Sequence, residues 1–279
     1  MSNKEQPKPI RRILVALDAS PHSLASLEIA AAMAERFDAE LVGIYIEDIN
    51  LIRLARLPTT HEVGFYSASI RQVEPTHVER QLRAQARKAR RALALIVEGT
   101  QVPWTFSVAR GAIHRELLDA ALDADLLILG KVGWSGRRQI GSTAQVAVIK
   151  SPHHTLIYDR GVDLQRPILV IYDGSTSGRD ALATANHIKT EESLVTVLIV
   201  AEVPDRAEIL ENEASRWSQD HDLEPHFLWS PRLDGDLIAR LVWSEGLGLI
   251  VLPAEIGSLS DEALIRLVDR ANCAVLILR

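Results

Sequence analysis

One local sequence pattern occurs twice in this chain. A short apolar run, 13–17, ends in Asp18-Ala19-Ser20, and a later run, 168–172, ends in Asp173-Gly174-Ser175. Each is followed by a stretch in which apolar residues recur at helical spacing. The later apolar runs of the two copies also correspond: 125–129 matches 248–252, and 155–157 matches 275–277. The chain is therefore a duplication of one unit rather than a long array of repeats.

Within each copy, apolar runs of about five residues alternate with amphipathic stretches, which is typical of buried parallel strands joined by crossover helices. In the first copy this predicts strands near 12–17, 40–46, 102–108, 125–130 and 154–158, and helices near 21–37, 76–98, 112–123 and 143–150. In the second copy it predicts strands near 167–172, 194–201, 225–229, 247–252 and 273–278. The predicted fold is α/β, with two tandem Rossmann-like domains, each an open five-stranded parallel sheet with helices on both faces.

A length of 279 residues suits two domains of ordinary size. The polar stretch 159–165 separates the copies, so we expect domains at 1–160 and 161–279. The second copy lacks most of the segment 49–75, which we expect to be a loop or short-helix excursion of the first.

Charge and composition exclude several classes of protein. Residues 1–160 carry 21 basic and 17 acidic side chains, a net charge of +4, and the rest carry 10 and 20, a net charge of −10. This asymmetry favours docking of the halves and is too mild for a nucleic-acid binder. The sequence has no apolar stretch of membrane-spanning length, a polar N-terminus and a single cysteine, Cys273, within an apolar run. We expect a cytoplasmic protein with a buried, unreactive thiol.

The stretch 130–143 is the richest in residues that could carry chemistry. Its glycines let backbone amides approach a phosphate, and Gly141-Ser142-Thr143 at a helix N-terminus offers free N–H groups, hydroxyls and the positive end of the helix dipole. Asp18 also follows a strand, and ligands of open parallel sheets bind beyond the carboxyl ends of the strands. The simpler interpretation remains open: the glycines make turns and the hydroxyls cap the helix.

These motifs resemble the ATP-binding pattern of universal stress proteins: an aspartate after the first strand, then G-x-x-G and G-S/T after the fourth. The resemblance covers both halves and implies strand order 3-2-1-4-5. It implies that Asp18 contacts the ribose or adenosine, that Ile46 flanks adenine, and that the phosphates of ATP, with or without Mg²⁺, are held by Gly130, Gly133, Gly141, Ser142 and Thr143. Seven residues separate Gly133 from Gly141, a shorter spacing than the family's pattern has.

The second copy departs further from this pattern. Pro253 replaces the first glycine and has no N–H to donate, while Glu255 and Asp261 add negative charge that repels phosphate. We expect this copy to be free of nucleotide, with Asp173 as a strand-end cap. Lys131, Arg137 and Arg138 of the first loop could neutralise phosphate, although lysines and arginines in loops are more often solvated.

Three functions compete. The leading one is a stress-associated regulatory protein that binds ATP, and the second is a docking platform that has lost the nucleotide, which the shortened loop favours. The third, a nucleotide hydrolase, lacks a recognisable constellation of acid, base or thiol, so we expect no enzyme. The family's last strand commonly makes a dimer contact, so 154–158 and 273–278 should meet between the halves. We expect a homodimer.

Overall fold

The computed structural model describes residues 9–57, 60–63, 70–72, 74–132, 139–191, 193–256 and 259–279. The first half, up to residue 160, contains β1 (Arg12–Ala16), α1 (Pro21–Phe37), β2 (Glu40–Asp48), α2 (Ile49–Ala55), β3 (His61–Val63), β4 (Ile70–Gln72), α3 (Pro75–Ile96), β5 (Trp104–Gly111), α4 (Ile113–Ala121), β6 (Leu126–Gly130), α5 (Ser142–Lys150) and β7 (His154–Tyr158). Every strand and helix that the sequence predicted for this half is present, with ends shifted by a few residues at most.

The second half, from residue 161, repeats the alternation of strand and helix. Its elements are β8 (Ile168–Tyr172), α6 (Thr176–Ile188), β9 (Val195–Val200), α7 (Pro204–Gln219), β10 (His226–Ser230), α8 (Gly235–Glu245), β11 (Leu249–Pro253), α9 (Asp261–Arg270) and β12 (Ala274–Leu278). The five predicted strands are all confirmed. The division into domains at residue 160 stays a prediction.

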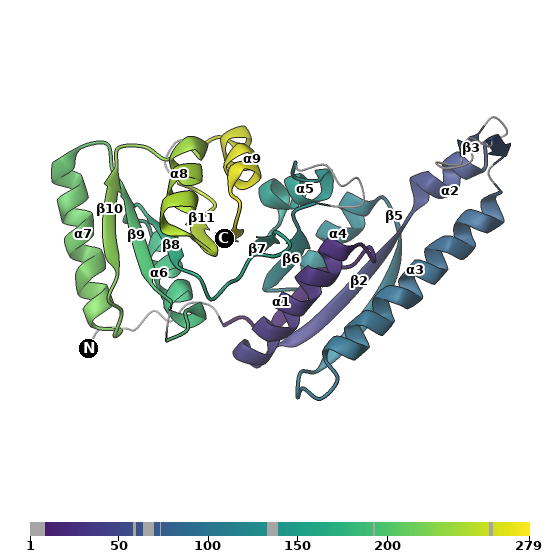
Figure 1. Ribbon diagram of the computed structural model, residues 1–279, viewed down its shortest axis with the longest axis horizontal. Helices are drawn as coiled ribbons and strands as arrows, with labels where there is room; N and C mark the ends of the chain where they lie inside the picture. The colour runs from purple at the N-terminus through teal and green to yellow at the C-terminus, as the bar shows by residue number, and fades with distance from the viewer. Residues whose placement is uncertain are drawn as a thin grey trace.

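The main sheet has the strand order β10-β9-β8-β11-β12-β7-β6-β1-β2-β5 and runs through the whole molecule (Figure 1). Each half supplies five parallel strands in the order 3-2-1-4-5, counting only the strands of the main sheet, as the resemblance implied. In such an order the carboxyl ends of the first, second and fourth strands lie side by side. Residues that follow β1, β2 and β6 can therefore share one site.

The two predicted sheets are joined into one, which corrects the expectation of two separate sheets. β12 pairs with β7 in the antiparallel sense, with Leu276 opposite Leu156 and Val275 opposite Ile157. Both strands are almost entirely buried. Without this pairing, β7 and β12 would each be an apolar edge strand with unpaired backbone groups. Pairing the two strands satisfies the backbone hydrogen bonds of both. The expected contact between the last runs of the two halves is confirmed in this form.

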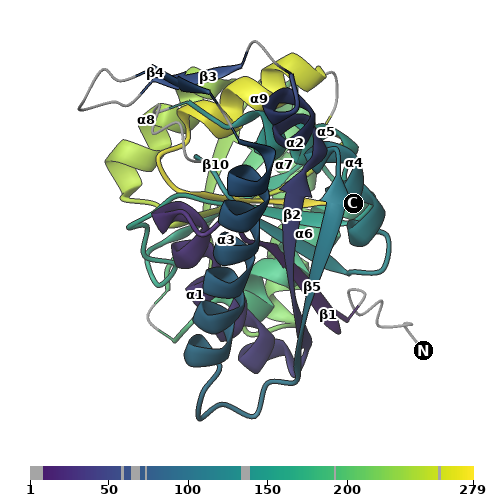
Figure 2. The same cartoon turned by 90° about the vertical axis from the view of Figure 1, so that its right-hand side faces the viewer.

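Helices cover both faces of the sheet. Figure 2 shows α1 and α3 on one side of β2 and α4 on the other. Two layers of buried apolar side chains result, one including Leu27 of α1 and Leu182 of α6, the other including Val148 of α5 and Leu267 of α9. Alternate residues of each buried strand enter alternate layers, because successive side chains of a strand point to opposite faces.

Local signals in the sequence explain where α1 begins and ends. Ser20 caps it, with its Oγ accepting a hydrogen bond from the amide of Ser23 at 3.2 Å, and Pro21 occupies the first turn. Asp38 ends the helix in the left-handed conformation, with a φ of 51°. This predicted helix start is confirmed, and it places Asp18 two residues before the N-cap.

The excursion predicted over 49–75 contains a short helix, α2, and an antiparallel pair, β3 and β4. Figure 1 shows α2 and the start of α3 extending beyond the sheet at the end of the molecule that carries β5. Of the helices that the described residues form, none has the length and apolar character needed to cross a membrane.

Candidate functional site

The turn after β1 is held by Asp18. Its Oδ1 accepts a hydrogen bond from the amide of Ser20 at 2.8 Å, and its own amide donates to Ser23 Oγ at 3.4 Å. Between them, Ala19 is buried and adopts a φ of 60°, which L-residues other than glycine rarely do. The turn is therefore fixed by side-chain contacts at some cost in backbone strain, as residues of binding sites often are.

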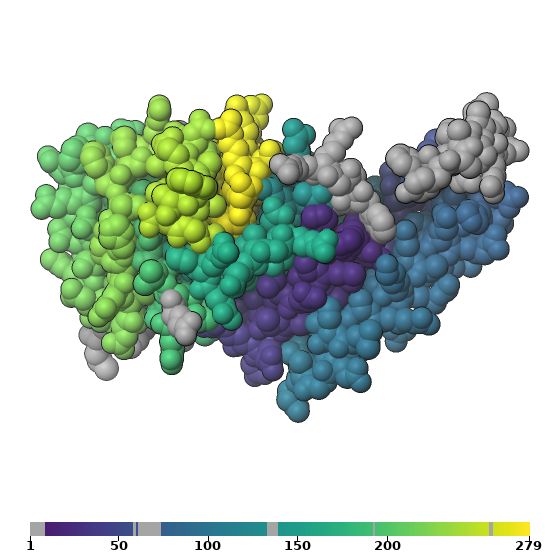
Figure 3. Space-filling view, viewed as in Figure 1, coloured from purple at the N-terminus to yellow at the C-terminus, as the bar shows by residue number. Residues whose placement is uncertain are grey.

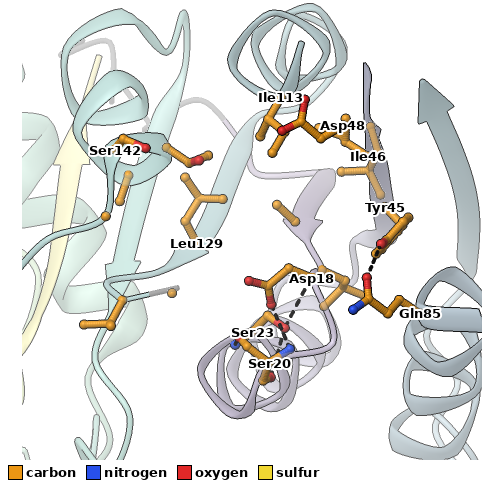
Figure 4. A pocket seen from close by; sticks show the side chains of 18 of the residues that line it. Asp18, Ser20, Ser23, Tyr45, Ile46, Asp48, Gln85, Ile113, Leu129 and Ser142 are labelled. Atoms are coloured by element: carbon orange, nitrogen blue, oxygen red, sulfur yellow. Dashed lines mark hydrogen bonds between the residues drawn. The ribbon is translucent and has the colours of Figure 1, made fainter. Parts of the chain in front are cut away.

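A cavity of about 340 Å³ opens at the carboxyl ends of β1, β2 and β6, a size within the range of small-molecule sites (Figure 4). Six stretches of chain meet there: the end of β1 with the start of α1, the end of β2 with α2, the middle of α3, the start of α4, the end of β6, and the start of α5. The lining residues are Ala16, Leu17, Asp18, Ser20, Ser23, Ile44, Tyr45, Ile46, Asp48, Leu51, Leu82, Gln85, Ile113, Leu129, Gly130, Val132, Gly141, Ser142, Thr143 and Ala144.

Six of the seven residues selected from the sequence line this cavity: Asp18, Ile46, Gly130, Gly141, Ser142 and Thr143. The seventh, Gly133, lies outside the described residues, as do Arg137 and Arg138. Their shared place at one cavity is a structural fact, and their roles toward a ligand stay a prediction.

The start of α5 presents backbone donors to the cavity. Its N-cap is Gly141, and within the described part of the chain no side chain accepts a hydrogen bond there, whereas Ser20 caps α1. As far as the described residues go, the first amides of α5 are therefore left for a ligand or for water. Gly130 also has a packing role, because a Cβ at this position would lie 3.3 Å from the backbone carbon of His22.

Opposite α5, Tyr45 and Gln85 close the wall of the cavity (Figure 4). The Tyr45 hydroxyl donates to Gln85 Oε1 at 2.7 Å. Burial, with smaller contributions from Glu47 and Asp18, raises the pKa of Tyr45 to about 12, so it remains a neutral donor at physiological pH. With Asp48, whose Oδ1 accepts from the amide of Asn50 and caps α2, these residues add polar groups to the site.

Sequence reasoning missed these residues for different reasons. Asp48 ends β2 much as Asp18 follows β1, so its position at a strand end could have identified it. Gln85 and Leu82 lie in the middle of α3, and only the packing of that helix beside β2 brings them to the cavity.

The charges on the described part of the lining are acidic. Asp18 and Asp48 are carboxylates, and no lysine, arginine or histidine is among the described residues that line the cavity. Nor do the described residues contain a group of three or more histidine, cysteine, aspartate or glutamate side chains that could hold a metal ion.

Lys131 does not reach the cavity and is not solvated, which corrects both interpretations of this residue. It is 2% exposed, and its Nζ donates to the carbonyl oxygen of Ala271 in the second half at 2.6 Å. Burial lowers the pKa of Lys131, and the nearby carboxylates of Asp159 and Asp269 oppose that shift. The side chain is therefore part of the contact between the halves.

The second half has a different arrangement at the equivalent place. Its α9 is capped by its own Ser260, whose Oγ accepts from the amide of Ala263, and begins with Asp261 and Glu262. This N-terminus is both self-capped and acidic, unlike that of α5. Asp173 accepts a hydrogen bond from the amide of Ser175 at 2.9 Å, the same contact that Asp18 makes with Ser20, so its role as a strand-end cap alone stays a prediction.

The sequence and the structure of this chain are both similar to those of known proteins. The model of the universal stress protein family matches residues 9–159. A universal stress protein from Archaeoglobus fulgidus DSM 4304 has a similar structure over 96% of this chain and 96% of its own, with 14% identity and a TM-score of 0.71. A functionally unknown protein from Pseudomonas aeruginosa PAO1 is similar over 96% and 92%, with 14% identity and a TM-score of 0.59. At these identities the likeness is one of fold. No curated protein matches the chain.

Proposed function

We propose that this chain, which belongs to the universal stress protein family, binds ATP in the cavity of its first half, and that occupancy changes its conformation or its binding to partner proteins. Under this proposal it acts in the cytoplasm as a homodimer and without catalytic turnover. The first domain, 1–160, carries the site, and the second, 161–279, does not bind nucleotide.

One observation carries the proposal. Residues selected from the sequence for a nucleotide, in four separate stretches of chain, line one cavity of suitable size at the carboxyl ends of the strands. Ligands of open parallel sheets bind at this place. The uncapped start of α5 supports a phosphate site, since free amides and the helix dipole favour an anion there.

Each part of the cavity has a separate role in this proposal. Asp18 accepts hydrogen bonds from ribose hydroxyls, and Ile46 packs against adenine. Gly130, Gly133, Gly141, Ser142 and Thr143 hold the phosphates. Because the described lining is acidic, Mg²⁺ bound with the nucleotide would reduce repulsion between the phosphates and Asp18 or Asp48.

A docking platform without nucleotide is the second candidate. The acidic lining and the short spacing between Gly133 and Gly141 favour it, because both weaken a site for a triphosphate.

Calorimetric titration and thermal melting with ATP, ADP, AMP and adenosine separate the two. We expect one ATP per chain, and a stabilisation of about 2.7 kcal/mol at a ligand concentration a hundredfold above Kd. Asp18→Ala should weaken ATP and adenosine alike, whereas Gly141→Val should weaken ATP far more than adenosine, with Gly141→Ala as the smaller control. If millimolar nucleotides leave the melting temperature unchanged, the docking platform replaces this proposal.

A further inference from the structure

A carboxylate of the second half holds the backbone just before α5. The amide of Ile140 donates to Asp269 Oδ1 at 2.7 Å, a bond between residues 129 positions apart. Asp269 lies in the last turn of α9. Three hydrogen bonds within the first half hold the same short stretch. Gln145 Nε2 donates to the carbonyl oxygen of Ile140, and the amide of Gln145 donates to the carbonyl oxygen of Gly141. The amide of Gly141 in turn donates to the carbonyl oxygen of Lys131. Asp269 thus links this stretch to the second half.

The other end of the same loop is held by α9 as well. Lys131 follows β6 directly, and its Nζ donates to the carbonyl oxygen of Ala271, the C-cap residue of α9. A cation at a helix C-terminus is favourable because the dipole is negative there. The Nζ also lies 3.9 Å from Asp159. Lys131 and Ile140 are therefore both attached to the C-terminal end of α9.

The far end of α5 has a third contact of this kind. The guanidinium of Arg279 donates to the carbonyl oxygen of Val148 in the last turn of α5, and the amide of Arg279 donates to His154 Nδ1 at 3.1 Å. In the space-filling view of Figure 3, α9, in yellow, lies directly against the teal surface of the first half. The second half thus contacts α5 at its end and the backbone that leads into it.

We infer that the second half is a positioning element for the ligand of the first half, and that Asp269 is the residue through which it fixes the start of α5. The inference rests on the proposed function for the identity of the ligand. It gives the second half a role that needs no nucleotide of its own: it sets the direction of the α5 amides that would meet the phosphates. Asp269 is a positioning residue, since it does not line the cavity.

The position of these contacts predicts which part of the ligand depends on them. On the nucleoside side of the cavity, Asp18 follows β1, and Tyr45 and Ile46 belong to β2. Among the described residues, no hydrogen bond joins α9 to either strand. Only the α5 side is attached to Asp269. Loss of Asp269 should therefore weaken the binding of phosphate groups and spare that of the nucleoside. By linkage, ATP should in turn stabilise the end of α9.

The test compares Asp269→Ala with Asp269→Asn in the full chain. Alanine removes the acceptor, whereas asparagine keeps an oxygen that can accept from the Ile140 amide. Glu262→Ala is the matched control, because Glu262 is on the same helix, is 85% exposed in its side chain and pairs only with Arg266 among the described residues. Melting temperatures establish that each variant folds.

We expect Asp269→Ala to raise the Kd for ATP about three- to tenfold, the effect of one lost hydrogen bond, and to leave that for adenosine unchanged. Asp269→Asn and Glu262→Ala should stay within about twofold of the wild type. Hydrogen exchange gives an independent readout: peptides covering 139–144 should exchange faster in Asp269→Ala without ligand, and ATP should slow exchange at 269–273 in the wild type.

Two results overturn the inference alone: wild-type affinity for ATP in Asp269→Ala, or an equal weakening of ATP and adenosine, which would indicate a general loss of structure. If the wild type binds no ATP, the proposed function fails and the coupling fails with it. The exchange rate at 139–144 then still decides whether Asp269 holds the backbone before α5.

Discussion

Ala19 and Gly174 occupy the same point of the two copies and share a left-handed backbone, with φ of 60° and 82°. Each comes directly after an aspartate that follows the first strand of its half. That aspartate accepts a hydrogen bond from the amide of the residue two positions further on. A side chain in this conformation costs roughly 1–2 kcal/mol, and glycine avoids the cost. The strain is therefore retained only in the copy that carries the cavity.

Replacing Ala19 with glycine should stabilise the protein. Relief of the left-handed strain exceeds the extra chain entropy that glycine brings to the unfolded state, so we expect a gain of about 0.5–1 kcal/mol in the free energy of unfolding. Gly174→Ala should do the opposite and cost at least about 1 kcal/mol, because its Cβ would lie 2.4 Å from Leu210 Cδ2. Urea unfolding of both variants measures the pair, and a destabilised Ala19→Gly protein would contradict the assignment of strain.

Substitution of Leu276 tests how much the pairing of β7 with β12, which joins the two halves, contributes to stability. It is fully buried opposite Leu156 in the antiparallel pair of β7 and β12. Leu276→Ala should lower the free energy of unfolding by about 2–5 kcal/mol, as cavities in buried cores do. Leu194→Ala is a suitable control, since Leu194 is 71% exposed and its loss should change stability by no more than about 0.5 kcal/mol. Equal effects of the two substitutions would show that the pairing of β7 with β12 contributes little to stability.

The thiol of Cys273 should be unreactive in the native protein. It is 1% exposed, and burial raises its pKa to about 12 from an ordinary value of 9.0. We expect no labelling by a thiol reagent at pH 8 until the chain is unfolded. Labelling of the native protein at the rate of a free thiol would contradict the burial of Cys273.

The same shift makes stability depend on pH. The unfolded thiol loses its proton near pH 9 while the folded one keeps it, so this contribution is complete below pH 9 and is lost as pH rises toward 12. The slope is about 1.4 kcal/mol per pH unit. Cys273→Ala should remove this pH dependence. Urea unfolding of the wild type and the variant at pH 8, 9 and 10 measures it, and we expect the difference between their free energies of unfolding to shrink as pH rises.

Tyr45→Phe removes the hydroxyl that donates to Gln85 and should cost about 0.5–1.5 kcal/mol at pH 7. The raised pKa of Tyr45 favours the folded state fully below pH 10, and that contribution is lost as pH rises from 10 toward 12. The difference between wild type and variant should therefore be constant from pH 7 to 9 and should decrease above pH 10. A difference that grows with pH would contradict this environment for Tyr45.

Short stretches of the sequence predict much of this structure. Apolar runs predicted the strands, and Ser20-Pro21 predicted the start of α1. The duplicated pattern predicted that the two halves correspond. These features depend on contacts between residues a few positions apart, so a local pattern is enough to predict them. The positions after β1 and β6 were predictable for the same reason, once the parallel sheet was assumed.

Other features depend on partners that lie far apart in the sequence, and only the tertiary structure decided them. No local pattern shows that Lys131 turns from the loop to the carbonyl of Ala271, or that Asp269 accepts from Ile140. The packing of α3 brings Gln85 to the cavity, and the pairing of Leu156 with Leu276 turns two sheets into one. A buried cation or an apolar edge strand must find some partner, but which partner it finds is set by the packing of the whole chain.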